Sequence, residues 1–357
     1  MSSMKLGRRV WVLPIAGILA VVLYLYFFID ISETVEAISQ ANALLCGLAL
    51  LFVLNGLFFY GVTWEVILRA MSKPLGIWRA FQYACASVFT ATMLPMGTLS
   101  GESLRAYMAV KDSNGNPGSV VASIISHRSV DMMPFLGNAC IGLIFMLTMQ
   151  QYFSFAVYVV SSVILLVIFT ISLVLYLVLR PEKTGGILNG IFRFVGRFYK
   201  NSTKLNRLRE KAVEELKLFH ESIEDLSHKP LSLCAAILSA TISVVSDIVA
   251  AKLVFQALGA DVSLGIIITV YTIAISLQTI PIGLPGMVGP VEVSMITLYS
   301  LAGILPAIGA AATLILRSMS LWFEVALGGV MAYWVGINIF KKQPIDAQFP
   351  PISVLDR

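Results

Sequence analysis

The sequence predicts an all-α membrane protein, a helical bundle of about six spans plus two re-entrant helical hairpins in an inverted-topology repeat. Apolar residues make up 58% of the 357 residues, charged residues make up 13%, and the mean hydropathy is +0.86. Soluble domains are about half apolar and a quarter charged. The other two observations are a pair of Gly/Pro-rich blocks at matching places and an uneven distribution of basic residues.

The two Gly/Pro blocks lie inside apolar segments. The first reads PMGTLSGE at 95–102 and the second reads PIGLPGMVGPVE at 281–292, and each ends on a Glu. Pro and Gly do not propagate a helix, and broken backbone at membrane depth survives only when it is buried in protein or lines a watery cavity. Two interrupted segments at matching places are the sequence signature of a transporter binding site.

The distribution of Lys and Arg predicts the topology. Basic clusters alternate with segments that lack Lys and Arg at 30–41, 149–154, 258–262 and 300–306. The positive-inside rule places the basic clusters and both termini in the cytoplasm, which predicts a multi-pass protein of the cell membrane. The predicted full spans are 10–29, 42–68, 119–148, 155–179, 231–257 and 305–340.

Two segments remain, 79–110 and 263–303, and they hold the Gly/Pro blocks. The charge pattern requires each to enter and leave from one side, as a hairpin of two short helices. A single discontinuous span is the alternative for either. Residues 42–150 and 231–340 then form two repeats of opposite orientation within one membrane domain, 1–357. A chance resemblance between two Gly/Pro-rich turns stays open.

Between the repeats lies a polar stretch, 180–230, whose apolar residues recur at helical spacing, with a break at 201–203. Basic residues fill its other faces. This pattern favours a pair of amphipathic helices on the anionic lipids of the inner leaflet. A plain solvated connector is the alternative. The pattern argues against nucleic acid as a partner.

The intramembrane ionisable residues are the candidate substrate-binding residues. Glu102 and Glu292 end the two blocks, and each either starts a helix or faces a headgroup in the cavity. Arg128 stands three residues before Asp131, and Arg317 seven before Glu324, so each couple shares a helix face. Each couple is either an ion pair that fixes helix packing or contains an arginine that binds a phosphate group. The second alternative rests on the guanidinium, whose N–H groups match phosphate oxygens. The remaining candidates are Arg105, as a third anchor, and Asp247, deep in its span.

Glycines and prolines of the blocks are the candidate cavity backbone, because the chain must turn tightly and approach a headgroup closely. These residues are Pro95, Gly97, Gly101, Pro281, Gly283, Pro285, Gly286 and Gly289. The sequence contains no catalytic, metal-binding or nucleotide-binding motif that we recognise, so we expect no cofactor and no metal.

The motifs LPMGTLSGESLRAYM, HRSVD, TIPIGLPGMVGPVE and LILRS resemble the flippase half of lysylphosphatidylglycerol synthases and related stand-alone membrane proteins. The resemblance covers about residues 10–340 and implies a lipid-translocating bundle with re-entrant helices. The second block reads GLPGMVG where the family more often has PGGxG, so Met287 alters the pattern at the cavity. We expect no lysyl transfer, because the chain ends at Arg357 with no room for a transferase domain.

Two function classes stay open. The first is a flippase for a lipid with a phosphate-bearing headgroup. The second is a membrane enzyme or accessory subunit in glycolipid or polyprenyl-linked glycan assembly. Inverted repeats favour the flippase, because alternating access uses them and an enzyme does not need them. A second copy of the chain, or a separate lipid-modifying enzyme, is left open as a partner.

The topology can be tested by labelling single cysteines in a cysteine-free variant with a membrane-impermeant maleimide. Cysteines within 111–118 and 180–229 are expected to react only from the cytoplasm, and those within 258–262 only from outside. Labelling of 111–118 from outside would overturn the re-entrant assignment and the inverted repeat with it.

Overall fold

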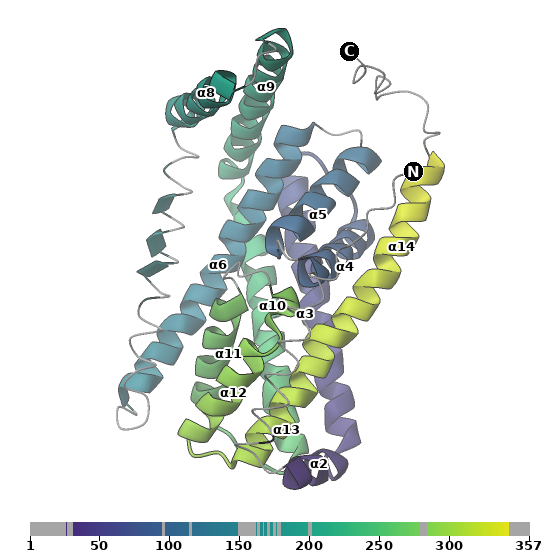
Figure 1. Cartoon of the computed structure of the whole chain (residues 1–357), viewed down its shortest axis with the longest axis vertical. Helices are drawn as coiled ribbons and strands as arrows, with labels where there is room; N and C mark the ends of the chain where they lie inside the picture. Colours follow the sequence, from purple (N-terminus) through teal and green to yellow (C-terminus); the bar gives the residue numbers. More distant parts are fainter. Residues whose placement is uncertain are drawn as a thin grey trace.

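The protein is described from a computed structural model. The structure describes residues 26, 31–94, 97–113, 116–148, 180–198, 202–278 and 284–342, and a few helical residues between 162 and 176. Within these residues every regular element is a helix (Figure 1). The predicted all-α class is therefore confirmed.

Four helices are long and apolar enough to cross a membrane. They are α3 (Ala43–Ala70), α6 (Pro117–Thr148), α10 (Pro230–Ala257) and the continuous helix Pro306–Gly336. They coincide with four of the six predicted spans. The predicted span 10–29 and most of 155–179 lie outside the described residues.

Helices α3 and α10 pack against each other antiparallel along the centre of the bundle (Figure 1). Asn55 donates to Ser246 at 2.8 Å, and Ser243 donates to the Gly56 carbonyl at 2.8 Å. A Cβ on Gly56 would lie 3.0 Å from an Asp247 carboxylate oxygen. Small and polar residues therefore allow the two backbones to approach closely, as in other membrane helix pairs.

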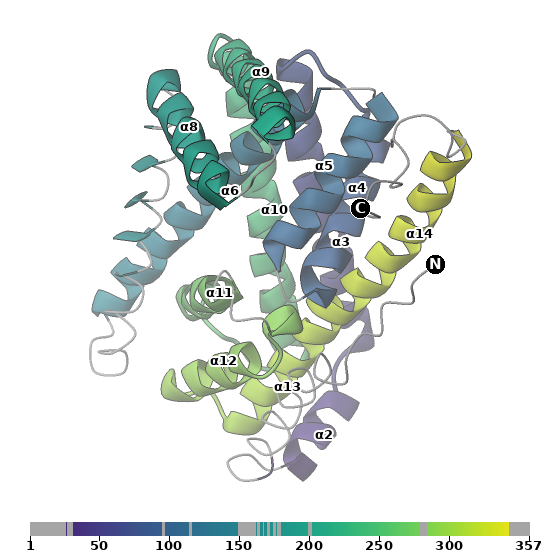
Figure 2. The same cartoon turned by 45° about the horizontal axis from the view of Figure 1, so that its top comes forward.

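Each Gly/Pro block separates two short helices. The first block contains the break between α4 (Ile77–Met93) and α5 (Thr98–Ser113) and extends into the first turn of α5. The second lies between α11 (Leu264–Gln278) and α12 (Pro290–Leu301), with the short helix η2 (Pro285–Met287) in the break. These helices have 17, 16, 15 and 12 residues, fewer than the roughly 20 that a span needs. The pairs lie toward opposite ends of α3 and α10 (Figures 1 and 2). Their return to one membrane side stays a prediction.

The glycines of the blocks serve two different purposes. Gly97, Gly286 and Gly289 have positive φ angles of 54°, 60° and 104°, which a residue with a Cβ rarely adopts. Gly101 instead lies inside α5, where a Cβ would be 2.4 Å from the Ser87 carbonyl oxygen of α4. The expectation that Gly101 forms a turn is therefore wrong, because its role is helix packing. Pro95, Pro281 and Gly283 lie outside the described residues.

The last long helix is not uniform. It consists of α13 (Pro306–Arg317), a π-helical segment η3 (Ser318–Phe323) and α14 (Glu324–Lys342). Such π-helical turns are rare and occur often at functional sites. This one separates Arg317 from Glu324, two of the predicted site residues. Helix α6 also contains an internal proline, Pro134, three residues after Asp131.

The connector 180–230 forms two helices, α8 (Pro181–Phe198) and α9 (Ser202–Ser227). The apolar residues Phe219, Ile223 and Leu226 of α9 pack into a core cluster with α3, α6 and α10. The C-terminal part of the predicted membrane-facing stripe therefore contacts the protein itself. The segment 30–41, which lacks Lys and Arg and lies between the first two predicted spans, contains helix α2 (Ile31–Ser39).

Replacing Gly101 with Ala is expected to lower the thermal stability of the protein in detergent. The added Cβ must displace α5 from the Ser87 backbone, and such overpacking costs about 1–3 kcal/mol. Gly137→Ala in α6 is the matched control, because nothing lies within 4 Å of its Cβ position. Equal melting temperatures for the two variants would contradict the close contact between α4 and α5.

Candidate functional site

Four of the predicted site residues form two Glu–Arg pairs at matching places. The Arg128 Nε donates to a Glu102 carboxylate oxygen, and the Arg317 Nε donates to Glu292 at 2.5 Å. Each pair joins the second helix of a broken pair to the long helix that follows it. The packing-pair alternative placed Arg128 against Asp131 and Arg317 against Glu324, and neither couple is an ion pair among the described residues. The Glu in each block takes the guanidinium instead.

The Glu292–Arg317 pair holds the second break together. The other Glu292 oxygen accepts from the Gly289 N–H at 2.7 Å, and the Arg317 Nη2 donates to the Gly286 carbonyl at 2.7 Å. Pro290 is the first residue of α12 and Glu292 lies in its first turn, so Glu292 is a helix-start residue as well as an ion-pair partner.

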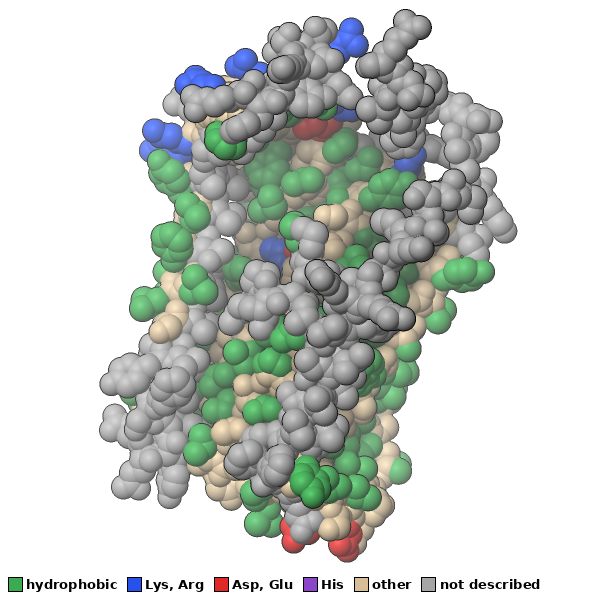
Figure 3. Space-filling model, viewed as in Figure 1, with side chains coloured by type: hydrophobic (Ala, Val, Ile, Leu, Met, Phe, Trp, Pro, Cys, Tyr) green, Lys and Arg blue, Asp and Glu red, His purple; other side chains and the backbone are tan. Residues whose placement is uncertain are grey.

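The two pairs differ in exposure. The side chains of Arg128 and Glu102 are 38% and 21% exposed, whereas those of Arg317 and Glu292 are 7% and 5% exposed. Glu102 is the fifth residue of α5, so it does not cap the helix. Figure 3 shows a hollow between α6 and α14 in the upper half of the molecule, where a basic and an acidic side chain meet. The first pair is open and the second is closed.

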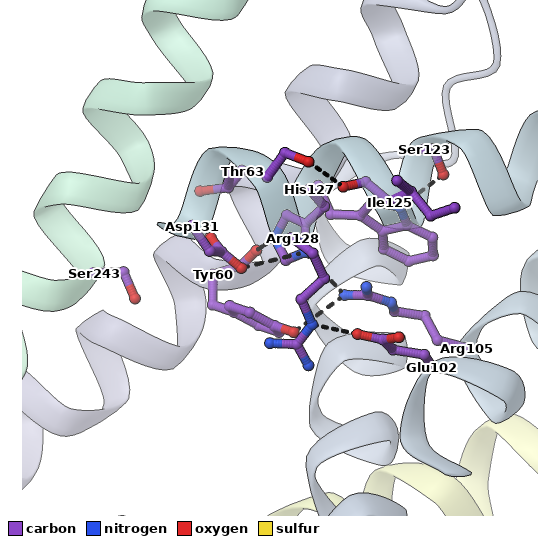
Figure 4. Close-up of polar contacts among 12 residues, drawn as sticks. Tyr60, Thr63, Glu102, Arg105, Ser123, Ile125, His127, Arg128, Asp131 and Ser243 are labelled. Carbon is purple, nitrogen blue, oxygen red and sulfur yellow. Dashed lines mark hydrogen bonds and ion pairs between the residues drawn. The ribbon is translucent and has the colours of Figure 1, made fainter. Parts of the chain in front are cut away.

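The first pair belongs to a larger group of polar and aromatic side chains, which we call the Arg105 cluster (Figure 4). It comprises Tyr60, Trp64, Glu102, Arg105, His127, Arg128 and Asp131. The Arg105 side chain is fully buried, with its guanidinium carbon 4.7 Å from the Trp64 ring centroid. Its Nη1 lies 3.4 Å from the Tyr60 hydroxyl and 3.3 Å from the His127 Nδ1. Because the Arg105 guanidinium is buried, it does not contact a phosphate group at the protein surface in this conformation.

His127 connects Arg105 to Asp131. The His127 Nε2 lies 3.1 Å from the Tyr60 carbonyl oxygen, and a carbonyl only accepts, so this nitrogen carries the hydrogen. The Nδ1 of the neutral ring then accepts from Arg105. An Asp131 carboxylate oxygen lies 3.5 Å from the same Nδ1 and has no hydrogen-bond partner.

The second half contains a cavity of about 200 Å³ between α10, α11, α12 and α13, the α10–α13 cavity. The predicted residues Asp247, Arg317 and Glu324 all line it, on both sides of the π-helical segment. Tyr271 donates to Asp247 at 2.9 Å. With Arg317 paired to Glu292, the polar groups that line the cavity are two carboxyl groups, the Gln278 amide and the hydroxyls of Tyr271, Tyr299 and Ser320.

Sequence reasoning missed several side chains of both sites. In the Arg105 cluster these are Tyr60, Trp64 and His127, and in the cavity they are Tyr271, Gln278 and Ser320. His127 directly precedes Arg128, so a charged-residue search could have included it. The two tyrosines lie in long apolar segments, where an aromatic ring has no distinctive pattern.

Comparison with known proteins gives a family and no solved structure. The family model of the lysylphosphatidylglycerol synthase TM region matches residues 14–328. A UPF0104 membrane protein of Methanothermobacter thermautotrophicus is 28% identical, over 93% of this chain and 97% of the relative. A UPF0104 membrane protein of Pyrococcus horikoshii is 23% identical, over 90% and 96%. No solved structure gives a significant match.

Arg317→Ala is expected to destabilise the protein more than Arg128→Ala. Loss of Arg317 leaves a buried carboxylate without its partner, which costs about 3–5 kcal/mol, whereas the exposed pair is worth about 1 kcal/mol or less. The melting temperatures of the two variants in detergent measure this. Equal decreases would contradict the closed and open assignment, and Glu292→Ala/Arg317→Ala is expected to recover part of the loss.

Proposed function

We propose that this chain, which belongs to the lysylphosphatidylglycerol synthase TM region family, translocates a lipid with a phosphate-bearing headgroup between leaflets. The family supports a role that involves membrane lipids. Translocation without chemical change, by a protein that is not an enzyme, is the proposal. The protein would act in the cell membrane, with both termini in the cytoplasm.

The proposal rests on one observation, which is that the two equivalent Glu–Arg pairs differ in the exposure of their side chains. Each pair couples a broken helix pair to the next long helix, and one is partly exposed while the other is buried. Alternating access moves one repeat against the other, so that one side of the site is open at a time, and a difference in exposure between equivalent pairs supports such a mechanism. We infer that the structure represents the state open at the Arg128 half.

The charges of the open half favour an anionic headgroup. The Arg128 side chain of α6 is 38% exposed and pairs with Glu102 of α5. A guanidinium offers parallel N–H groups that match two phosphate oxygens. Apolar helix faces around a polar cluster suit a molecule with acyl chains and a charged end.

The closed half complements this arrangement. The α10–α13 cavity has about 200 Å³, less than the roughly 300 Å³ at which ligand pockets usually begin. Its two carboxyl groups, on Asp247 and Glu324, suit a proton or the cationic part of a headgroup once the second pair opens.

The proposal is tested by reconstituting the purified protein in liposomes with fluorescently labelled phosphatidylglycerol. The protein is expected to expose inner-leaflet label to an impermeant quencher faster than protein-free liposomes do. Thin-layer chromatography of the recovered lipid is expected to give no new product. A new product would favour the membrane enzyme, and an unchanged exposure rate would count against translocation.

Gly286→Leu is expected to abolish translocation in this assay. Gly286 has φ 60°, and a Cβ there would lie 2.9 Å from the Leu321 side chain and 3.1 Å from Thr92. The nearby Val288→Leu is the control and is expected to be mild, because Val288 has an ordinary extended backbone. Full activity of Gly286→Leu would place the second break outside the transport pathway.

A further inference from the structure

Arg105 is a buried cation with one unused edge. Its Nη1 is the nitrogen that approaches Tyr60 and His127, and both of these partners are uncharged acceptors. Its Nε and Nη2 are buried and have no hydrogen-bond partner. Buried guanidinium groups without a carboxylate are costly, since burial removes the hydration of the charge.

The two free nitrogens form the edge of a guanidinium that binds anions. Nε–H and Nη2–H point in nearly parallel directions, so they can donate together to two oxygens of one phosphoryl or carboxylate group. The rings of Trp64 and Tyr60, at 4.7 Å and 5.7 Å, hold the guanidinium in place. The edge is therefore positioned in advance for a bidentate acceptor.

The neighbouring carboxylates are directed elsewhere. Glu102 accepts from Arg128, and Asp131 faces His127. Figure 4 shows the Arg128 side chain and the Glu102 carboxylate beside the Arg105 guanidinium. Because this pair is partly exposed and lies beside Arg105 (Figure 4), we infer that a ligand reaches Arg105 when Arg128 rotates away from Glu102.

The second half has no equivalent residue. Arg105 follows Glu102 by three residues, and the residue three positions after Glu292 is Met295. Met295 is a buried apolar residue that lines the α10–α13 cavity. The unused guanidinium edge therefore distinguishes the first half from the second.

We propose that the free edge of Arg105 is an anion site that binds the phosphoryl group of a lipid headgroup, with Arg128 as the second cation once it leaves Glu102. This inference rests on the proposed function, because it names the contact that a translocated lipid makes. Binding would proceed in this order: the Arg128–Glu102 pair opens, the phosphoryl group enters, and both guanidinium groups then donate hydrogen bonds to it.

The site is tested by titration calorimetry, which measures the binding of small probes to the detergent-purified full chain. The probes are dihexanoyl phosphatidylglycerol, inorganic phosphate, acetate and the phosphate-free dihexanoylglycerol. Dihexanoyl phosphatidylglycerol is expected to bind saturably and dihexanoylglycerol is not. Arg105→Lys keeps the charge and removes the fork, so it is expected to weaken binding about tenfold or more.

Glu102→Gln gives a result of opposite sign. It removes the carboxylate that competes for Arg128, so phosphatidylglycerol is expected to bind more tightly than to the unmodified protein. Arg79→Lys is the matched control, since Arg79 forms a partly exposed ion pair with Asp112, and its affinity is expected to be unchanged. If Arg105→Lys fails to fold, Glu102→Gln decides.

Three results would overturn the site. Arg105→Lys would bind dihexanoyl phosphatidylglycerol as tightly as the unmodified protein does, or Glu102→Gln would bind it no more tightly. The third is that dihexanoylglycerol binds the unmodified protein as tightly as dihexanoyl phosphatidylglycerol does. Binding of inorganic phosphate without the lipid would reject a lipid source, and equal binding of acetate would reject the phosphoryl group. Binding as expected, without any translocation in liposomes, would leave the site standing and remove the proposed function.

Discussion

The constraint on which the architecture depends is the need to satisfy broken backbone inside an apolar bundle. A helix that stops in the membrane leaves N–H and carbonyl groups without partners, and each costs several kcal/mol if unmet. At the second break, Glu292 accepts from the Gly289 N–H and Arg317 donates to the Gly286 carbonyl. The charges in turn neutralise each other. One ion pair therefore makes an interrupted helix compatible with its surroundings.

The sequence predicts those parts of this arrangement that depend on local chemistry. Long apolar segments give the four described spans, and the positive φ angles of Gly286 and Gly289 follow from the composition of the block. The partners of the arginines could not be predicted in this way. Helical spacing relates Arg128 to Asp131 on one helix, but it carries no information about Glu102 on another. The same limit applies to Gly101, whose neighbour belongs to α4.

The two halves share a plan and differ in chemistry. Both contain a broken helix pair and a Glu–Arg bridge, yet the first adds Arg105 and His127 while the second adds Asp247 and Glu324. The first half therefore holds a buried guanidinium, Arg105, whose Nε and Nη2 have no hydrogen-bond partner, and the second holds two carboxyl groups, Asp247 and Glu324, around a small cavity. A substrate with an anionic and a cationic part would find its complementary charges in different halves, which we propose as the basis of orientation within the protein.

The contact between α9 and α6 joins the connector to the Arg105 cluster. Glu215 of α9 accepts from the Gly118 N–H at 2.6 Å, and a Cβ on Gly118 would lie 2.1 Å from the Glu215 carbonyl oxygen. Ten residues along the same helix stands Arg128, and Pro134 then interrupts the hydrogen-bond ladder of α6. The first turn of α6 is therefore held against α9, and Arg128 stands on the same continuous helix. The position of the connector thus constrains the helix that carries the exposed half of the charged cluster.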